Sequence, residues 1–562
     1  MREHRWPVFA KGFLKNFWWY DRKCVFLHRH SLQIAFMGIF INRGNNDFRR
    51  ILNGEYVDKT GLIAAVNQTL FTERSMSCVT RCRRFGKSMA AKMLCAYYDD
   101  SCDSRSLFAG LEIEKEASFE KHLNKYPVIY LDMTDFITRF RNDDNIVSHI
   151  DREVRNEIQA LFPDIPGEEG DDLMALLLRV VQHTNKPFFF IIDEWDAICR
   201  EFPSGSKSMD SYVNWLRRMF KSVSANNAFA GVYMTGILPI KKYDTQSGLN
   251  NFWEYSMVEP MNMASFFGFT KDEVRALAAK HKMDFDELEA WYDGYQIGDE
   301  PSVFNPNSVM MALKSRRCRS FWGGTATFNV VSGYIGMNFK GLKDNVIYLL
   351  SGGRVKVNTT KFRNDLSVIN SKDDVLTVLI HLGYLSFDWR RNECYVPNYE
   401  VSGELSNAVE EGNWDNVISA LQQSEQLLND TIAGDEEAVA RALEVAHSDD
   451  TSILSYNDEN SLACVISIAY YYAKNDYHVH REYATGKGFA DLVMIPRKHV
   501  DKPAIIVELK KDKDAKTGID QIKERKYPQK VAEYSGDILL VGINYDTETK
   551  QHTCHIERWM KD

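Results

Sequence analysis

The chain has no apolar run that approaches the roughly 18 residues needed to span a membrane, so the sequence predicts no transmembrane helix. Its ten cysteines are scattered and form no Cys-x-x-Cys pair, which argues against a disulfide framework and favours a cytoplasmic protein with reduced thiols. Residues 1–36 mix aromatic and basic residues without the pattern of a secretory signal. We interpret them as a doubtful N-terminal extension in front of a native start at Met37.

A surplus of basic residues over the whole chain is also absent. The net charge of −9 argues against a uniformly basic nucleic-acid-binding surface. The charges are unevenly distributed, because residues 421–460 contain ten acidic residues and one basic residue, whereas residues 481–530 contain thirteen Lys or Arg against eight Asp or Glu. An acidic connector therefore precedes a basic C-terminal module, and a length of 562 residues requires several domains.

Apolar segments and predicted helices alternate in the N-terminal half. We predict strands at 126–132, 188–193 and 228–235, each separated from the next by helical sequence. This alternation indicates an α/β fold with a parallel sheet that is covered by helices on both faces. Ligands of such a sheet bind at the carboxyl ends of its strands, where the candidate residues described next are found.

A strand, a tight loop and a helix are predicted around Gly86-Lys87-Ser88. Such a loop directs backbone N–H groups and one lysine at a polyphosphate, and leaves a hydroxyl for Mg²⁺. We expect Gly86 to admit the phosphates, Lys87 to neutralise the β and γ oxygens, and Ser88 to bind Mg²⁺. The alternative, a basic turn at a helix start, is disfavoured because the helix dipole repels cations there. Arg83 and Arg84 are candidates for further phosphate contacts or an arginine finger, and solvated surface arginines are the equal alternative.

The apolar run at 188–192 ends in two carboxylates, Asp193 and Glu194. Carboxylates at the end of a buried strand are rare unless they bind something, although a strand that simply ends at the surface is the alternative. We expect Asp193 to hold Mg²⁺ together with Ser88, and Glu194 to polarise the attacking water. Thr235, at the end of another predicted strand, is expected to sense the γ-phosphate. With the loop, these residues predict ATP hydrolysis.

A second set of acidic and basic residues lies near the C-terminus. The predicted order is a helix at 461–474, strands at 478–484, 489–495 and 504–509, a helix around residue 521 and a strand at 538–543. Asp491 and Glu508 lie on neighbouring strands and can share Mg²⁺. Lys510 follows Glu508 by two residues, so both side chains lie on one face, where the lysine orients or deprotonates water.

Further residues support this second site. Glu459, before the apolar helix, is a candidate ligand or supporting group, and Gln521 is expected to orient Lys510 or a phosphate. The alternative is a solvated edge strand with a charged turn. The basic residues that would attract a polyanion are Lys511, Lys513, Lys516, Lys523, Arg525 and Lys526.

Taken together, the motifs resemble those of bacterial proteins that combine an AAA-ATPase-like N-terminal domain with a C-terminal domain of the PD-(D/E)XK nuclease superfamily. The similarity covers roughly residue 37 to the end. Arg81 stands where a glycine usually begins the loop motif, and this agrees with the family, whereas Cys82 replaces the family's usual proline. In related enzymes a tyrosine often follows the glutamine of the nuclease helix by four positions. Here Tyr527 follows Gln521 by six, so we assign it no role. The matching segments are YVDKTGLI (56–63), RCRRFGKS (81–88), IIDEWD (191–196), TGILPI (235–240), WYDGY (291–295), FNP (304–306), GFADLVM (488–494), VELK (507–510) and QIKERKY (521–527).

The resemblance implies an α/β protein with four parts after the extension. These are a P-loop-type parallel-sheet ATPase domain at 37–260, a mostly helical middle region at 261–420, the acidic connector at 421–455, and a restriction-endonuclease-like α/β domain at 456–562. The connector is predicted to be either two amphipathic helices or a solvated linker.

We therefore predict a protein that binds and hydrolyses ATP, coupled to a Mg²⁺-dependent nuclease that acts on nucleic acid, with DNA favoured. One alternative is an ATP-driven regulatory switch that binds nucleic acid or protein without cleaving it, and another is an interaction protein whose two sites are vestigial. The intact Asp491, Glu508 and Lys510 argue against the switch, and binding of labelled ATP with Mg²⁺ would discriminate the interaction protein. The basic C-terminal domain is the expected contact with nucleic acid, no membrane contact is expected, and a homo-oligomer is compatible with this interpretation.

Overall fold

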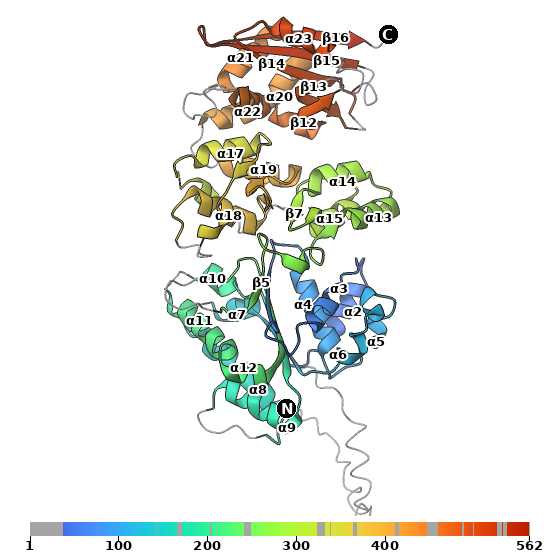
Figure 1. Cartoon of the computed structure of the whole chain (residues 1–562), viewed down its shortest axis with the longest axis vertical. Coiled ribbons are helices and arrows are strands. Elements are labelled where there is room, and N and C mark those ends of the chain that lie inside the picture. The colour runs from blue at the N-terminus through green and yellow to red at the C-terminus, as the bar shows by residue number, and fades with distance from the viewer. Residues whose placement is uncertain are drawn as a thin grey trace, which may run out of the picture.

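The computed structural model describes residues 38–560, with gaps at 142, 166–170, 203–204, 241–248, 323–331, 338, 363–367, 411–414, 447–458, 486–487, 498–499, 525–530 and 532–536. The doubtful extension at 1–36 and the proposed start at Met37 lie outside these residues. Figure 1 shows an elongated molecule in which an N-terminal unit, a middle region and a C-terminal unit follow one another along the long axis.

A five-stranded sheet forms the centre of the N-terminal unit. Its order is β2-β3-β4-β1-β5 and every pairing is parallel, which confirms the predicted sheet. Strand β4 lies between β1 and β3, so the loop after β1 and the acidic end of β3 flank the end of β4. The strands are β1 (Met76–Thr80), β2 (Val128–Asp132), β3 (Phe188–Asp193), β4 (Phe229–Gly236) and β5 (Trp253–Tyr255).

Helices cover both faces of this sheet, as Figure 1 shows. In β3, Phe188, Phe190 and Ile192 join the core on one face, and Phe189 and Ile191 join the core on the other, as the period of two in a strand requires. The first face is covered by α7 (Met133–Phe140), α8 (Ile146–Leu161), α9 (Leu173–Thr184), α10 (Ala197–Glu201), α11 (Lys207–Phe220) and α12 (Val223–Ala228). The second is covered by α2 (Asn46–Leu52), α3 (Gly61–Asn67), α4 (Lys87–Tyr98), α5 (Arg105–Phe108), η1 (Glu112–Lys115) and α6 (Phe119–His122).

The middle region combines helices with two small sheets that the sequence analysis did not predict. One sheet has the order β6-β8-β7 and the other β10-β11-β9. The strands are β6 (Phe269–Thr270), β7 (Tyr295–Ile297), β8 (Glu300–Phe304), β9 (Val355–Lys356), β10 (Ser386–Asp388) and β11 (Glu393–Tyr395). The helices are η2 (Met261–Met263), α13 (Lys271–His281), α14 (Phe285–Tyr292), α15 (Pro306–Ser315), α17 (Leu342–Leu350), η3 (Thr359–Lys361), α18 (Lys372–Leu382) and α19 (Tyr399–Glu410).

The WYDGY motif connects the end of α14 to the start of β7 inside this region. Gly294 has a φ of +101°, and a Cβ atom there would lie 1.9 Å from the carbonyl oxygen of Pro397. Only glycine fits such a position, because it has no side chain and tolerates positive φ. The hydroxyl of the next residue, Tyr295, donates to the carbonyl of Gly383 at 2.7 Å. The motif therefore joins the two halves of the middle region.

Helix α19 contacts the C-terminal unit directly and is linked to the N-terminal unit through Phe321. Near its start, the Glu400 carboxylate accepts a hydrogen bond from the backbone N–H of Phe321 at 2.6 Å, and the Phe321 carbonyl accepts one from the Arg84 guanidinium of the N-terminal unit. Two residues later, the Ser402 carbonyl accepts a hydrogen bond from the Tyr471 hydroxyl of the C-terminal unit at 2.7 Å. The side chain of Lys474 donates to the Ser402 hydroxyl at 3.1 Å. One helix thus lies between the two units.

The C-terminal unit is built on a sheet of order β12-β13-β14-β15-β16, in which only β14 and β15 are parallel among the described pairings. Helix α23 (Ala515–Glu524) connects the two parallel strands. The predicted strands are confirmed, and β16 was not predicted. The strands are β12 (Tyr477–Thr485), β13 (Gly488–Pro496), β14 (Ala504–Lys511), β15 (Asp537–Asp546) and β16 (Gln551–Met560).

The acidic stretch 421–455 does not form a solvated linker over its described part. It forms the end of α20 (Asp415–Ala433) and α21 (Glu436–Ala446), which bury Leu427, Leu428 and Leu443. The Glu436 carboxylate accepts a hydrogen bond from the backbone N–H of Ile556 in β16 at 2.8 Å. These helices therefore pack on the C-terminal sheet with α22 (Glu459–Ala469) and η4 (Tyr471–Asn475), instead of separating it from the middle region.

Within the described residues, none of the helices has the length and apolar character that a membrane crossing would require. The cysteines of these residues are free thiols.

Candidate functional sites

The predicted phosphate loop joins β1 to α4. Gly86 caps α4 with a φ of +91°, and the position where a Cβ atom would stand faces open space. Lys87 is the first residue of the helix, and its buried Nζ donates to the carbonyl of Cys82 at 3.1 Å. Ser88 is the second residue and is half-buried. The lysine therefore lies over the loop, where a phosphate oxygen can replace the carbonyl that it now contacts.

Arg81 does not face the loop. Its fully buried guanidinium donates to the carbonyls of Thr80 at 2.8 Å, Tyr255 at 2.7 Å, Ser256 at 3.1 Å and Met263 at 3.0 Å. Burial lowers the pKa of this guanidinium to about 10. The arginine at the first-glycine position therefore fixes the end of β1 against the segments after β5.

The two following arginines point in different directions. Arg84 has a φ of +67°, is exposed, and donates to the carbonyl of Phe321 in the middle region. Arg83 is half-buried and lies near Arg200 and Glu194: burial and the charge of Arg200 lower its pKa, and the Glu194 carboxylate opposes this shift. Of the two, Arg83 is the one close to the acidic end of β3.

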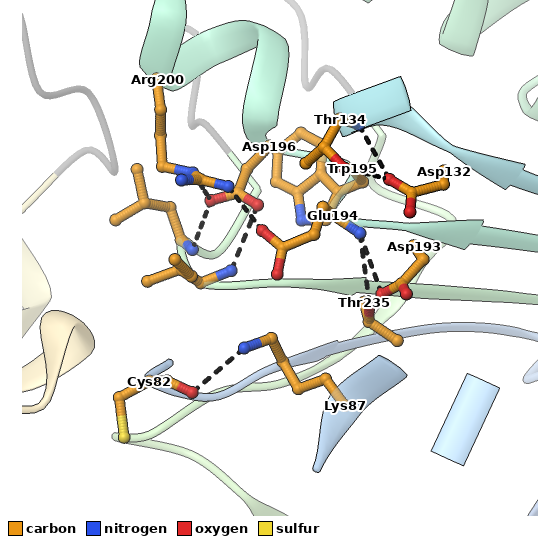
Figure 2. A network of polar contacts seen from close by, with 12 residues as sticks. Cys82, Lys87, Asp132, Thr134, Asp193, Glu194, Trp195, Asp196, Arg200 and Thr235 are labelled. Carbon is orange, nitrogen blue, oxygen red and sulfur yellow. Dashed lines mark hydrogen bonds and ion pairs between the residues drawn. The ribbon is translucent and has the colours of Figure 1, made fainter. Parts of the chain in front are cut away.

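The acidic end of β3 meets the end of β4 in a hydrogen-bonded group (Figure 2). The buried Asp193 carboxylate accepts hydrogen bonds from the Thr235 hydroxyl and, at 3.0 Å, from the Tyr130 hydroxyl. The backbone N–H of Glu194 donates to the same carboxylate at 3.1 Å. The predicted convergence of Asp193, Glu194 and Thr235 is thus observed, and Figure 2 shows Lys87 facing this group across the site.

Glu194 is held in a specific orientation. Its backbone is left-handed, with a φ of +53°, and its Oε2 lies 2.5 Å from Nη2 of Arg200 in α10. Arg200 also contacts Oδ2 of Asp196 through Nε at 2.9 Å. Burial raises the pKa of Glu194, while the charges of Lys87 and Arg200 oppose that rise.

Three residues of this group were not predicted from the sequence: Tyr130, Asp196 and Arg200. Asp196 and Arg200 are four residues apart and follow the acidic pair directly, which is the spacing of an ion pair on one helix face. This spacing was a usable signal. The sequence contains no comparable signal for Tyr130, because its proximity to Asp193 depends on the pairing of β2 with β3.

The donor groups at this edge fit a nucleotide and Mg²⁺. An ammonium and the N–H groups at a helix start suit phosphate oxygens. A serine hydroxyl and a carboxylate are oxygen ligands of the kind Mg²⁺ prefers. The open space in front of Gly86 leaves room for the phosphates.

The C-terminal group lies on β13, β14 and α23. Asp491 accepts a hydrogen bond from the backbone N–H of Leu509 at 2.8 Å, which confirms that it lies beside the Glu508 strand. Nζ of Lys510 lies 3.0 Å from Oε1 of Glu508, so the two side chains share one face as predicted. Gln521 donates to the same oxygen of Glu508, rather than to Lys510. Four residues predicted from the sequence are therefore brought together.

The surroundings of this group are described in part. Glu459 begins α22, and its side chain lies outside the described part of the structure, as do Arg525 and Lys526. Lys513, Lys516 and Lys523 are exposed. In the described parts of the chain, no three His, Cys, Asp or Glu side chains are grouped to hold a metal. Two carboxylates still fit Mg²⁺, which commonly keeps several waters and takes further oxygens from a substrate phosphate.

Comparisons with known proteins agree with this division. Residues 43–246 match the family model described as predicted AAA-ATPase, and residues 457–555 match the model of the PD-(D/E)XK nuclease superfamily. A curated relative, an uncharacterized protein in the vnfD 5′ region of Azotobacter chroococcum mcd 1, is 26% identical over 305 residues, which are 51% of this chain. The chain spans about half the length, 54%, of that relative.

Two solved structures from Aeropyrum pernix show weak similarity. The ORC2 protein in ADPNP–ADP complexes is 12% identical with a TM-score of 0.31, over 65% of this chain and 98% of that one. The ORC1 protein in complex with DNA is 13% identical with a TM-score of 0.21, over 64% and 94%. From the two family matches and the two sheets, this chain carries an AAA-ATPase-like domain followed by a C-terminal domain of the PD-(D/E)XK nuclease superfamily.

Proposed function

We propose that the N-terminal domain binds and hydrolyses ATP with Mg²⁺. The observation that carries this half is the convergence of Lys87, Asp193, Glu194 and Thr235 at the carboxyl edge of one parallel sheet. Bound Mg²⁺ would neutralise charge on the phosphate oxygens, and Ser88 and Asp193 are the residues that would hold it.

The protein groups then have separate roles in this proposal. Gly86 lets the backbone approach the phosphates, and Lys87 exchanges the Cys82 carbonyl for phosphate oxygens. Glu194 accepts a proton from the attacking water, and Thr235 senses the γ-phosphate through the Asp193 carboxylate that its hydroxyl holds. Arg83, which lies near Glu194, adds a further phosphate contact in this proposal.

Lys87→Ala tests the first half. The full chain with this change is expected to lose ATP hydrolysis while its thermal melting stays close to that of the unchanged protein, because the change removes one hydrogen bond to a loop carbonyl. Lys115→Ala, at an exposed lysine of η1, is the matched control and should hydrolyse ATP normally. Equal turnover by the two variants would refute this half.

We propose further that the C-terminal domain cleaves nucleic acid, with DNA as the favoured substrate. The supporting observation is that Asp491, Glu508, Lys510 and Gln521 gather on two adjacent strands and the neighbouring helix. Bound Mg²⁺ would stabilise the phosphate charge, with Asp491 and Glu508 holding it. Lys510 orients or deprotonates the water, Gln521 restrains Glu508, and the exposed lysines attract the polyanion.

Glu508→Gln and Lys510→Ala test this second half. Each should abolish Mg²⁺-dependent cleavage of a DNA and RNA panel, assayed with and without ATP. Lys115→Ala, at an exposed lysine of the N-terminal unit, is the control and should cleave normally. Retained binding with no cleavage by the unchanged protein would favour a switch that binds nucleic acid without cutting it.

The free thiols of the described residues suit a cytoplasmic location, which we include in the proposal.

A further inference from the structure

Arg200 links the acidic end of β3 to the end of β4. Its guanidinium lies 2.5 Å from Glu194 and 2.9 Å from Asp196, and the side chain is largely buried. The Asp196 carboxylate accepts hydrogen bonds from the backbone N–H groups of Ile237 at 3.2 Å and Leu238 at 3.0 Å. A continuous chain of contacts therefore runs from the backbone just after Thr235 and Gly236 to the carboxylate of Glu194.

This chain of contacts has little freedom to move. A Cβ atom on Gly236 would lie 2.6 Å from Oδ1 of Asp196, so the end of β4 is packed directly against that carboxylate. Asp196 itself is fully buried. Arg200 is thus anchored through Nε by a fixed acceptor and directs Nη2 toward Glu194 (Figure 2).

Glu194 has other cations near it besides Arg200. Lys87 and Arg83, both of the phosphate loop, lie close enough to interact electrostatically with its carboxylate. Without Arg200, the half-buried Glu194 carboxylate would be left with these loop cations as its partners, because an unpaired charge that is partly removed from water is costly. A Glu194–Lys87 pair would occupy the lysine that the phosphates need.

We propose that Arg200 is a positioning residue that holds Glu194 off Lys87, so that the lysine stays available for phosphate and the carboxylate for water. This inference rests on the proposed ATPase function. It predicts that loss of Arg200 weakens nucleotide binding as well as turnover, and that the binding defect is caused by the charge of Glu194.

The test compares four full-length proteins: unchanged, Arg200→Gln, Arg200→Lys and the double variant Arg200→Gln with Glu194→Gln. The probe is a fluorescent, non-hydrolysable ATP analogue with Mg²⁺. Arg200→Gln should weaken binding about tenfold, the size expected when a charged hydrogen-bonded group is diverted. Arg200→Lys should bind within a few-fold of the unchanged protein, because its ammonium can still pair with Glu194.

The double variant decides between positioning and mere support of the fold. A neutral glutamine in place of Glu194 cannot compete for Lys87, so the double variant should bind the analogue nearly as tightly as the unchanged protein, although it hydrolyses no ATP. Binding as weak as that of Arg200→Gln alone would overturn the inference, as would a single variant that binds normally. The control is Arg141→Ala, which removes only the exposed ion pair to Glu201 of the same helix α10.

Failure of the proposed function has a different result. If the unchanged protein does not bind Mg²⁺ with the analogue, the ATPase proposal itself is wrong. If it binds the analogue and the variants do not follow the predicted order, only the role of Arg200 is wrong.

Discussion

The Thr235 hydroxyl donates a hydrogen bond to the Asp193 carboxylate across the neighbouring strands β4 and β3. The backbone N–H of Glu194 points to the same hydroxyl at 3.4 Å. One threonine therefore orients the carboxylate assigned to Mg²⁺ and lies against the backbone of the residue assigned to water.

Thr235→Val is expected to lower ATP hydrolysis by about 10- to 100-fold, because a displaced catalytic group of this kind costs that much. Valine keeps the shape and removes the donor, whereas Thr235→Ser keeps the donor and should retain most of the activity. Phosphate release at saturating ATP is the measurement. Wild-type turnover by a folded Thr235→Val protein would contradict the assignment.

Arg81→Lys should destabilise the protein although it preserves the charge. A lysine cannot reproduce a planar guanidinium that contacts four backbone carbonyls, and buried carbonyls left without donors cost about 1–3 kcal/mol each. We expect a loss of several kcal/mol in urea unfolding of the N-terminal domain. Arg105→Ala, at an exposed arginine, should change stability by less than about 1 kcal/mol. Equal midpoints for the two variants would show that Arg81 does not have this structural role.

Gly294→Ala and Gly403→Ala should have opposite effects on the stability of the folded protein. The first places a Cβ atom 1.9 Å from the Pro397 carbonyl at a φ of +101°, so it should cost several kcal/mol or prevent folding of the middle region. The second adds a Cβ atom to α19 where nothing lies within 4 Å, so it should stabilise by about 0.5–1 kcal/mol. Thermal melting of both proteins checks this pair, and the same sign for both would refute it.

Glu400 should make stability depend on pH. Burial raises its pKa from 4.5 to about 7, so the folded protein binds this proton more tightly than the unfolded chain does. Its contribution is therefore most favourable below about pH 4.5 and is lost as the pH rises to about 7. Glu400→Gln should raise the melting temperature relative to the unchanged protein more at pH 8 than at pH 5. A difference that is the same at both values would exclude this titration.

The parts that local pattern determines were predictable from the sequence. The run Phe188–Asp193 identifies a buried strand with a carboxylate at its end, and the spacing of Glu508 and Lys510 places them on one face. Strands such as β9, with two residues, were not predictable, because they form only by pairing with distant segments. The position of Arg200 depends likewise on the turn that directs α10 back over Glu194.

The acidic stretch shows where pattern alone left two answers. Val439, Leu443 and Ala446 have helical spacing, yet ten acids in forty residues also suit a solvated chain. Strand β16 decides between a helical and a solvated stretch. Helix α21 packs against this strand, and the Glu436 carboxylate accepts a hydrogen bond from the backbone N–H of Ile556. The stretch is helical because its apolar residues are buried in the packing against β16, a strand that was not predicted from the sequence.

Helix α19 has a consequence for any exchange of signals between ATP and nucleic acid. Glu400 and Ser402 lie two positions apart on this helix of 12 residues. Glu400 is bonded to Phe321, which is bonded in turn to Arg84 of the phosphate loop. Ser402 is bonded to the side chains of η4, the segment that precedes β12. A slide or rotation of this helix must therefore disturb both contacts at once, so any movement that α19 makes is felt in the phosphate loop and in the C-terminal unit together.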